Sequence, residues 1–217
     1  MRGRAPELRD DGGTVAVLLS GGRARRLGGL SKARVEVGGR AMLDLVLDAV
    51  LRAQVRRVVV VGDPPSTARE GVEVTREEPA YGGPLAALAA GLEAVPAAVA
   101  DVLVLACDLP RADELVPALL QAPEPAGADG AVLVDAGGRE QWLAGRYAAA
   151  PLRAVVWQVA EQRGGRLTGA PLRAALGRLA LVRLPDPDHA SDDVDTPEDL
   201  ARARAAASAR PTGGGPR

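Results

Sequence analysis

The chain has few of the side chains on which several common functions depend. It contains no Phe, only 2 % aromatic residues, one His and one Cys in 217 residues. A single cysteine, Cys107, cannot form an internal disulfide, and nothing marks the single His189 as the partner of a nucleophile. Recognition of single-stranded nucleic acid by base stacking also becomes a poor fit, because it relies on exposed aromatic side chains.

Long apolar runs and excess charge of one sign are missing as well. The chain shows no signal-peptide pattern and no apolar run approaching roughly 18 residues, so we expect a cytoplasmic protein that does not bind membranes. A formal net charge of −1 argues against a general nucleic-acid binder. We expect one domain over residues 13–208, flanked by polar, Gly-, Pro- and Arg-rich disordered tails at 1–12 and 209–217. The sequence does not indicate an oligomeric state.

Valine-rich apolar runs alternate with amphipathic segments along the chain. Strands are predicted at 14–19, 57–62, 72–75, 102–107, 130–134, 142–147 and 179–184, and helices at 42–53, 84–95, 112–120, 151–162, 171–177 and 197–207. This alternation predicts an α/β fold with a mostly parallel sheet covered on both faces. The turn signal Asp135–Gly138 between two strands leaves room for one antiparallel hairpin. Ligands of such sheets bind beyond the carboxyl ends of the strands.

The most informative segment is the loop that follows the first predicted strand. Of 27 basic residues only Lys32 is a lysine, and it closes the glycine-rich stretch 20–32 (SGGRARRLGGLSK). Glycines and cations at a strand end bring N–H groups and positive charge to one point, as a triphosphate requires. The spacing matches neither the P-loop nor the dinucleotide-binding fingerprint. The alternative is a solvated surface lysine.

Carboxylates follow two other predicted elements. Asp108 ends an apolar strand just before Leu109-Pro110, where it suits Mg²⁺ or, alternatively, caps a turn. Thr196 is a predicted helix cap with proline at the first helical position. Capping does not explain Asp193 and Asp195, which would repel each other unless a cation lies nearby. We therefore expect Asp108 and Asp195 to be metal ligands.

A fourth segment, 76–85 (REEPAYGGPL), combines acids with a Gly-Gly-Pro entry to a helix. Its glycines allow the backbone to approach a ribose or base closely, and Glu77 can accept two hydrogen bonds from a base edge. Arg139, Gln141, Arg163 and Arg166 fall in predicted loops where an anionic acceptor would dock, although solvated surface is the simpler interpretation.

Taken together, these segments resemble the nucleotidyltransferases related to molybdenum cofactor guanylyltransferase. Leu19–Lys32 is similar to the family loop L-A-G-G-x-x-x-R-M-G-x-x-K, segment 76–85 to its acid-plus-G-P-L loop, residues 107–110 to its C-D-x-P, and 193–200 to its N-x-N-T-P-E-x-L. The resemblance runs from about residue 14 to residue 206. This sequence departs from the pattern at Ser20 (usually Ala), at Ser31 (often Asp), and at Asp193 and Asp195 (usually Asn).

The resemblance implies a Rossmann-like three-layer fold and transfer of GMP from GTP to the phosphate of molybdenum-molybdopterin, with Mg²⁺ and release of pyrophosphate. It further implies these roles: Leu19, Ser20, Gly21 and Gly22 hold the nucleotide, Arg26 and Lys32 its phosphates, Glu77 and Gly83 the base and ribose, and Asp108 the metal. Lys32, Arg26 and Asp108 would be catalytic. Two alternatives stay open: a related transferase (cytidylyl-, uridylyl- or phospholactate guanylyltransferase), and a GTP-binding module without turnover.

Overall fold

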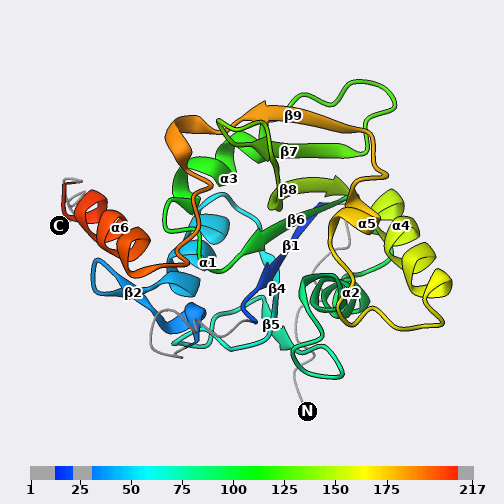
Figure 1. Cartoon of the computed structure of the whole chain (residues 1–217), viewed down its shortest axis with the longest axis horizontal. Coiled ribbons are helices and arrows are strands. Elements are labelled where there is room, and N and C mark those ends of the chain that lie inside the picture. The colour runs from blue at the N-terminus through cyan, green and yellow to red at the C-terminus, as the bar shows by residue number, and fades with distance from the viewer. Residues whose placement is uncertain (1–12, 22–30, 210–217) are drawn as a thin grey trace, which may run out of the picture.

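The centre of the molecule is a seven-stranded sheet with the order β5-β4-β1-β6-β8-β7-β9 (Figure 1). The structure is a computed structural model, and it describes residues 13–21 and 31–209. The strands of the sheet are β1 (Thr14–Leu19), β4 (Arg57–Val61), β5 (Val72–Thr75), β6 (Asp101–Ala106), β7 (Gly130–Val134), β8 (Glu140–Ala148) and β9 (Leu181–Pro185). A separate hairpin pairs β2 (Glu36–Val37) with β3 (Arg40–Ala41).

Most neighbouring strands are parallel. β1 pairs in parallel with β4 and β6, β4 with β5, and β7 with β9. β8 runs antiparallel to both of its neighbours, β6 and β7. The Asp135 carboxylate accepts hydrogen bonds from the N–H groups of Gly137 and Arg139 in the β7–β8 turn. The predicted mostly parallel sheet with one antiparallel hairpin is therefore confirmed.

Helices cover both faces of this sheet. They are α1 (Met42–Arg52), α2 (Pro84–Ala94), α3 (Ala112–Leu120), α4 (Ala149–Gln162), α5 (Arg173–Leu176) and α6 (Pro197–Ala209), with short 3-10 turns η2 (Lys32–Arg34) and η3 (Pro187–His189). Within the described ranges, none of these helices has the length and apolarity needed to cross a membrane. In Figure 1, α6 lies beside the β2 hairpin, away from the main sheet.

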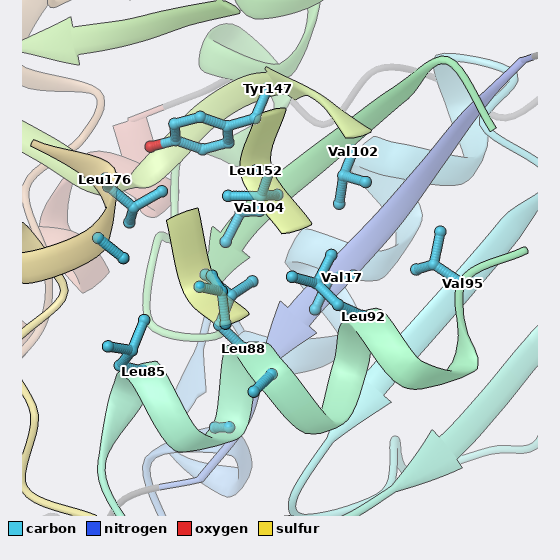
Figure 2. Packing of buried hydrophobic residues seen from close by; sticks show 14 of the residues in the cluster. Val17, Leu85, Leu88, Leu92, Val95, Val102, Val104, Tyr147, Leu152 and Leu176 are labelled. Carbon is cyan, nitrogen blue, oxygen red and sulfur yellow. The ribbon is translucent and has the colours of Figure 1, made fainter. Parts of the chain in front are cut away.

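The alternation of side chains along β1 divides the core into two layers. Val15, Val17 and Leu19 belong to a cluster with α2, α4 and α5, whereas Ala16 and Leu18 pack with α1 and α3. Figure 2 shows Leu85, Leu88 and Leu92 along α2, with Leu92 next to Val17 of β1. A Cβ on Gly91 of α2 would lie 2.6 Å from Val17 Cγ1, so α2 packs directly against the sheet. The result is the predicted three-layer sandwich.

The differences from the sequence prediction lie at element ends. β6 ends at Ala106, one residue earlier than predicted, so Cys107 and Asp108 belong to the turn that follows the strand. The β2–β3 hairpin was not predicted, because strands of two residues are too short to show a periodic pattern. Of the two predicted tails, only Ala209 is described, as the last residue of α6.

Candidate active site

The carboxyl ends of three parallel strands meet at one edge of the sheet. Leu19, at the end of β1, is paired with Val61 of β4 and Ala106 of β6, and the Cys107 N–H donates to the Leu19 carbonyl (3.1 Å). A cavity of about 870 Å³ opens at this edge. We call it the strand-end cavity, and its lining includes Leu19, Gly21, Lys32, Glu77, Tyr81, Gly83, Asp108, Arg139, Gln141, Trp142 and Asp193. A volume of this size suits a small-molecule site rather than a packing defect.

The strand-end cavity brings together most of the residues predicted to bind a nucleotide. Six of them line it: Leu19, Gly21, Lys32, Glu77, Gly83 and Asp108. Ser20 is fully buried and lies outside this lining, with its hydroxyl donating to the Asp63 carbonyl (2.7 Å) and its N–H to the Val61 carbonyl (2.9 Å). Its side chain ties the end of β1 to the end of β4. The predictions for Gly22 and Arg26 lie outside the described residues.

Two segments distant in sequence supply the carboxylates. Asp108 follows β6, and its carbonyl accepts a hydrogen bond from the Val194 N–H (3.3 Å), which anchors the segment before α6 beside it. Thr196 caps α6: its hydroxyl accepts from the Asp199 N–H (3.2 Å), and the Asp199 carboxylate accepts from the Thr196 N–H (2.8 Å). This reciprocal capping box confirms the predicted cap and fixes the direction in which the chain enters α6.

Capping leaves Asp193 and Asp195 free to face Asp108. Each of these three residues offers a carboxylate oxygen, and the three oxygens lie within 4.8 Å of one another. Asp108 is buried, whereas the Asp195 side chain is 45 % exposed. The structure thus brings Asp193 beside the two residues that the sequence predicted to be metal ligands. Carboxylate oxygens are the ligands preferred by Mg²⁺, and roughly 4 Å separates opposite ligands at ~2.1 Å from the ion, so the set fits a hard divalent cation after small adjustments.

A cationic side chain lies inside this carboxylate set. Lys32 Nζ is 2.6 Å from Asp108 Oδ2 and also donates to Asp195 Oδ1. Partial burial lowers the pKa of the Lys32 ammonium, but attraction to Asp108 and Asp195 and the hydrogen bonds to them outweigh burial and raise this pKa above its ordinary value. One ammonium does not balance three carboxylates. The pKa of the Asp193 carboxyl is raised, first by burial and then by repulsion from Asp108 and Asp195.

Glu77 presents an unsatisfied acceptor at another wall of the cavity. The residue is only 6 % exposed; its Oε1 accepts from the Tyr81 N–H (2.9 Å), while Oε2 is buried with no hydrogen-bond partner among the described residues. A Cβ on Gly21 would lie 4.0 Å from Oε1, so the Gly21 backbone lies close to this carboxylate. A buried carboxylate oxygen without a donor is costly, which points to a ligand that supplies one.

Gly83 forms the N-terminal cap of α2 beside Glu77. Its φ is +98°, in the region that favours glycine, and Pro84 follows at the first helical position. The first turn of a helix offers N–H groups without intrahelical partners, and here that turn begins at the cavity wall. Backbone donors and the Glu77 carboxylate can therefore contact the same ligand.

Sequence reasoning missed two aromatic side chains. The chain has two Trp and two Tyr, and of these four Tyr81 and Trp142 line the strand-end cavity. Tyr81 is 60 % exposed and has a positive φ of 63°. The signal that could have found both is their rarity: in a chain so poor in aromatics, an aromatic residue in a loop or at a strand start is a candidate binding residue.

Of the four residues predicted to dock an anionic acceptor, two line the cavity. Arg139 and Gln141 line the cavity, whereas Arg163 and Arg166 do not. Cys107 is 2 % exposed, and burial is the main cause that raises the pKa of its thiol. This agrees with the interpretation of Cys107 as a small core residue rather than a nucleophile.

Comparisons with known proteins agree with this geometry. A family profile described as "MobA-like NTP transferase domain" matches residues 16–177. A molybdenum cofactor guanylyltransferase of Cereibacter sphaeroides is 36 % identical over 195 residues, which cover 86 % of this chain and 93 % of the relative. A second relative with that name, from Acidiphilium cryptum, is 39 % identical over 120 residues, covering 53 % of this chain and 61 % of the relative.

Solved structures share the fold at low sequence identity. The molybdopterin-guanine dinucleotide biosynthesis protein A of Archaeoglobus fulgidus superimposes with a TM-score of 0.66 at 24 % identity, covering 89 % of this chain and 98 % of that one. A 2-C-methyl-D-erythritol 4-phosphate cytidylyltransferase from Francisella tularensis gives 0.71 at 11 % identity, covering 89 % and 99 %. Because proteins named for different nucleotides share this fold, the fold does not decide which base or acceptor is used.

Proposed function

Because this chain belongs to the family of MobA-like NTP transferases, we propose that it transfers GMP from GTP to the phosphate of a molybdenum-molybdopterin acceptor and releases pyrophosphate. The proposal is supported above all by one observation: a single cavity gathers Lys32, Asp108, Asp193, Glu77 and the glycines Gly21 and Gly83. Relatives named for this activity support the choice of base and acceptor.

The reaction needs no covalent enzyme intermediate. An oxygen of the acceptor phosphate attacks the α-phosphorus of GTP in line, and the bond to the β-phosphate oxygen breaks as pyrophosphate leaves. Negative charge builds on the phosphate oxygens, and Lys32 is the described side chain best placed to neutralise it. Mg²⁺ held by Asp108, Asp193 and Asp195 would supply further charge neutralisation at these oxygens. Catalysis by charge placement is consistent with a site that lacks a His.

The guanine base would lie against Glu77 and the start of α2. Guanine presents two adjacent donors, N1–H and N2–H₂, to an acceptor whose buried Oε2 has no partner within the part of the chain that the structure describes. Gly83 allows the backbone to come close to the base and ribose without a side chain in between. Base and phosphates would then occupy the β1 side of the strand-end cavity.

The acceptor would bind along β8, which supplies a different wall. Gln141 and Trp142 come from this strand, and Arg139 precedes it. An indole can stack on a flat heterocycle such as a pterin, and a guanidinium and an amide can hydrogen-bond to its polar edge. The acceptor phosphate would then point toward the phosphates of GTP.

The direct test is release of pyrophosphate from each of the four NTPs, with and without molybdopterin. We expect release only with GTP, the acceptor and Mg²⁺ together. Turnover of CTP or UTP would identify a related transferase, and tight GTP binding with no pyrophosphate release would identify a binding module. Asp108→Asn is the matched control, because it keeps the side-chain volume while it removes a charge from the carboxylate set.

Acceptor binding can be tested separately by fluorescence. The chain has two tryptophans, and Trp157, on α4 (Ala149–Gln162), does not line the strand-end cavity. In a Trp157→Phe variant the emission reports Trp142 alone, and saturable quenching by a pterin is expected. Quenching of equal strength in a Trp142→Phe variant that retains Trp157 would exclude stacking on Trp142.

A further inference from the structure

Lys32 lies where a metal ion would be expected. Its ammonium is hydrogen-bonded to Asp108 and Asp195, two of the three carboxylates whose oxygens converge within 4.8 Å. A divalent ion bound to Asp108 Oδ2 at about 2.1 Å would lie at most about 5 Å from an ammonium that keeps its 2.6 Å contact with the same atom. Two positive charges at that distance repel strongly in a partly buried site. The Lys32 ammonium and a bound metal therefore compete for the same oxygens of Asp108 and Asp195.

A lysine at position 32 suits a cation that changes its hydrogen-bond partners. Lys32 is the single lysine in a chain that otherwise uses arginine, and its side chain is only 20 % exposed. An ammonium on a flexible four-carbon stem can exchange one set of oxygens for another, whereas a planar guanidinium needs a matched fork of acceptors. Lys32 lines the same cavity as Gly21 and Gly83, so a phosphate chain bound beside it there would offer its ammonium a second set of oxygens.

We propose that Lys32 is the resident counter-ion of the carboxylate set in the nucleotide-free protein, and that the metal displaces its ammonium onto the phosphates of the incoming nucleotide. This inference rests on the proposed function, because it requires a nucleoside triphosphate in the strand-end cavity. Metal alone must then compete with Lys32 and binds weakly. Metal and nucleotide together bind well, because the displaced ammonium gains phosphate oxygens as partners.

The consequence is a positive coupling between metal and nucleotide that depends on Lys32. Couplings between two ligands are typically about 5- to 150-fold in affinity. Removing the ammonium should raise the affinity for the metal when no nucleotide is bound, because the metal loses a competitor. It should lower the affinity for the metal when nucleotide is bound, because the complex loses a partner of the phosphates.

The test measures Mn²⁺ binding by electron paramagnetic resonance for the wild type and Lys32→Met, each alone and with a non-hydrolysable GTP analogue. Methionine keeps the length of the stem and removes the charge. We expect Lys32→Met to bind Mn²⁺ at least fivefold more tightly than the wild type without nucleotide, and at least fivefold more weakly with the analogue. Circular dichroism checks that the variant is folded.

A matched charge control is available on α6. Arg202→Met also removes one positive charge near the site, but Arg202 bonds to Asp199 rather than to the three carboxylates. A tighter Mn²⁺ affinity of the same size in Lys32→Met and Arg202→Met would show a general field effect and overturn the proposal. An effect of Lys32→Met with the same sign in both states would overturn it as well. If the wild type failed to bind the analogue, the proposed function itself would fail, which is a different result.

Discussion

Glu77→Gln is expected to change the base preference of the enzyme without disturbing the fold. Glu77 Oε1 already accepts the Tyr81 N–H (2.9 Å), so the glutamine amide would place its carbonyl oxygen there to keep this bond. Its NH₂ group would then take the place of Oε2, the buried oxygen that has no partner among the described residues. A donor would face the guanine N1–H and N2–H₂ where an acceptor stood before.

The size of the effect follows from these contacts. Bidentate recognition of a base edge contributes about 1–3 kcal/mol of discrimination, which corresponds to roughly 5- to 150-fold in kcat/KM. Glu77→Gln should remove most of the preference for GTP over CTP, because cytosine places an N3 acceptor beside its N4 donor and meets the new NH₂ favourably. Loss of discrimination should therefore combine a lower kcat/KM for GTP with an unchanged or higher value for CTP.

The assay is pyrophosphate release at saturating acceptor with GTP or CTP varied. Thermal unfolding of the variant serves as the control, and its Tm should stay near that of the wild type because the Tyr81 hydrogen bond is retained. A GTP/CTP ratio that does not change would remove Glu77 from base recognition. Recognition of the base would then have to come from backbone groups around Gly83 and the start of α2 (Pro84–Ala94).

Three further predictions concern charge and burial. Lys32→Arg should lose at least a hundredfold in kcat with an unchanged fold, because a planar fork cannot present the same compact charge to the phosphates, and near wild-type kcat would contradict this reasoning. Asp108→Asn should abolish Mg²⁺-dependent turnover in a metal titration, whereas Asp195→Asn, more exposed and still offering a carbonyl oxygen, should be milder; equal losses would make Asp195 an equal ligand. The Cys107 thiol should resist a disulfide reagent at pH 8 until denaturant is added, because burial raises its pKa and excludes the reagent; rapid labelling of the native protein would show that the site opens.

Features that depend on local chemistry could be predicted from the amino-acid sequence. Continuous apolar runs located the central strands, because a strand that is buried on both faces carries apolar side chains on both. Glycines and Lys32 after β1 (Thr14–Leu19), and a carboxylate after β6 (Asp101–Ala106), predicted a site at the carboxyl ends of the strands. The helix cap at Thr196 could also be predicted from the local sequence, since its partner Asp199 is three residues away. Each of these signals spans only a few neighbouring residues.

Which of these groups contact one another depends on the folded chain. Lys32 and Asp195 are 163 positions apart, and no local pattern reveals that the ammonium lies among carboxylates rather than free for phosphate. Trp142 lines the cavity because β8 (Glu140–Ala148) pairs with β6. Ser20 is not part of the lining, and its hydroxyl donates to the Asp63 carbonyl instead. Such contacts are set by strand order and by backbone hydrogen bonds between distant segments, and these form only when the whole sheet is assembled.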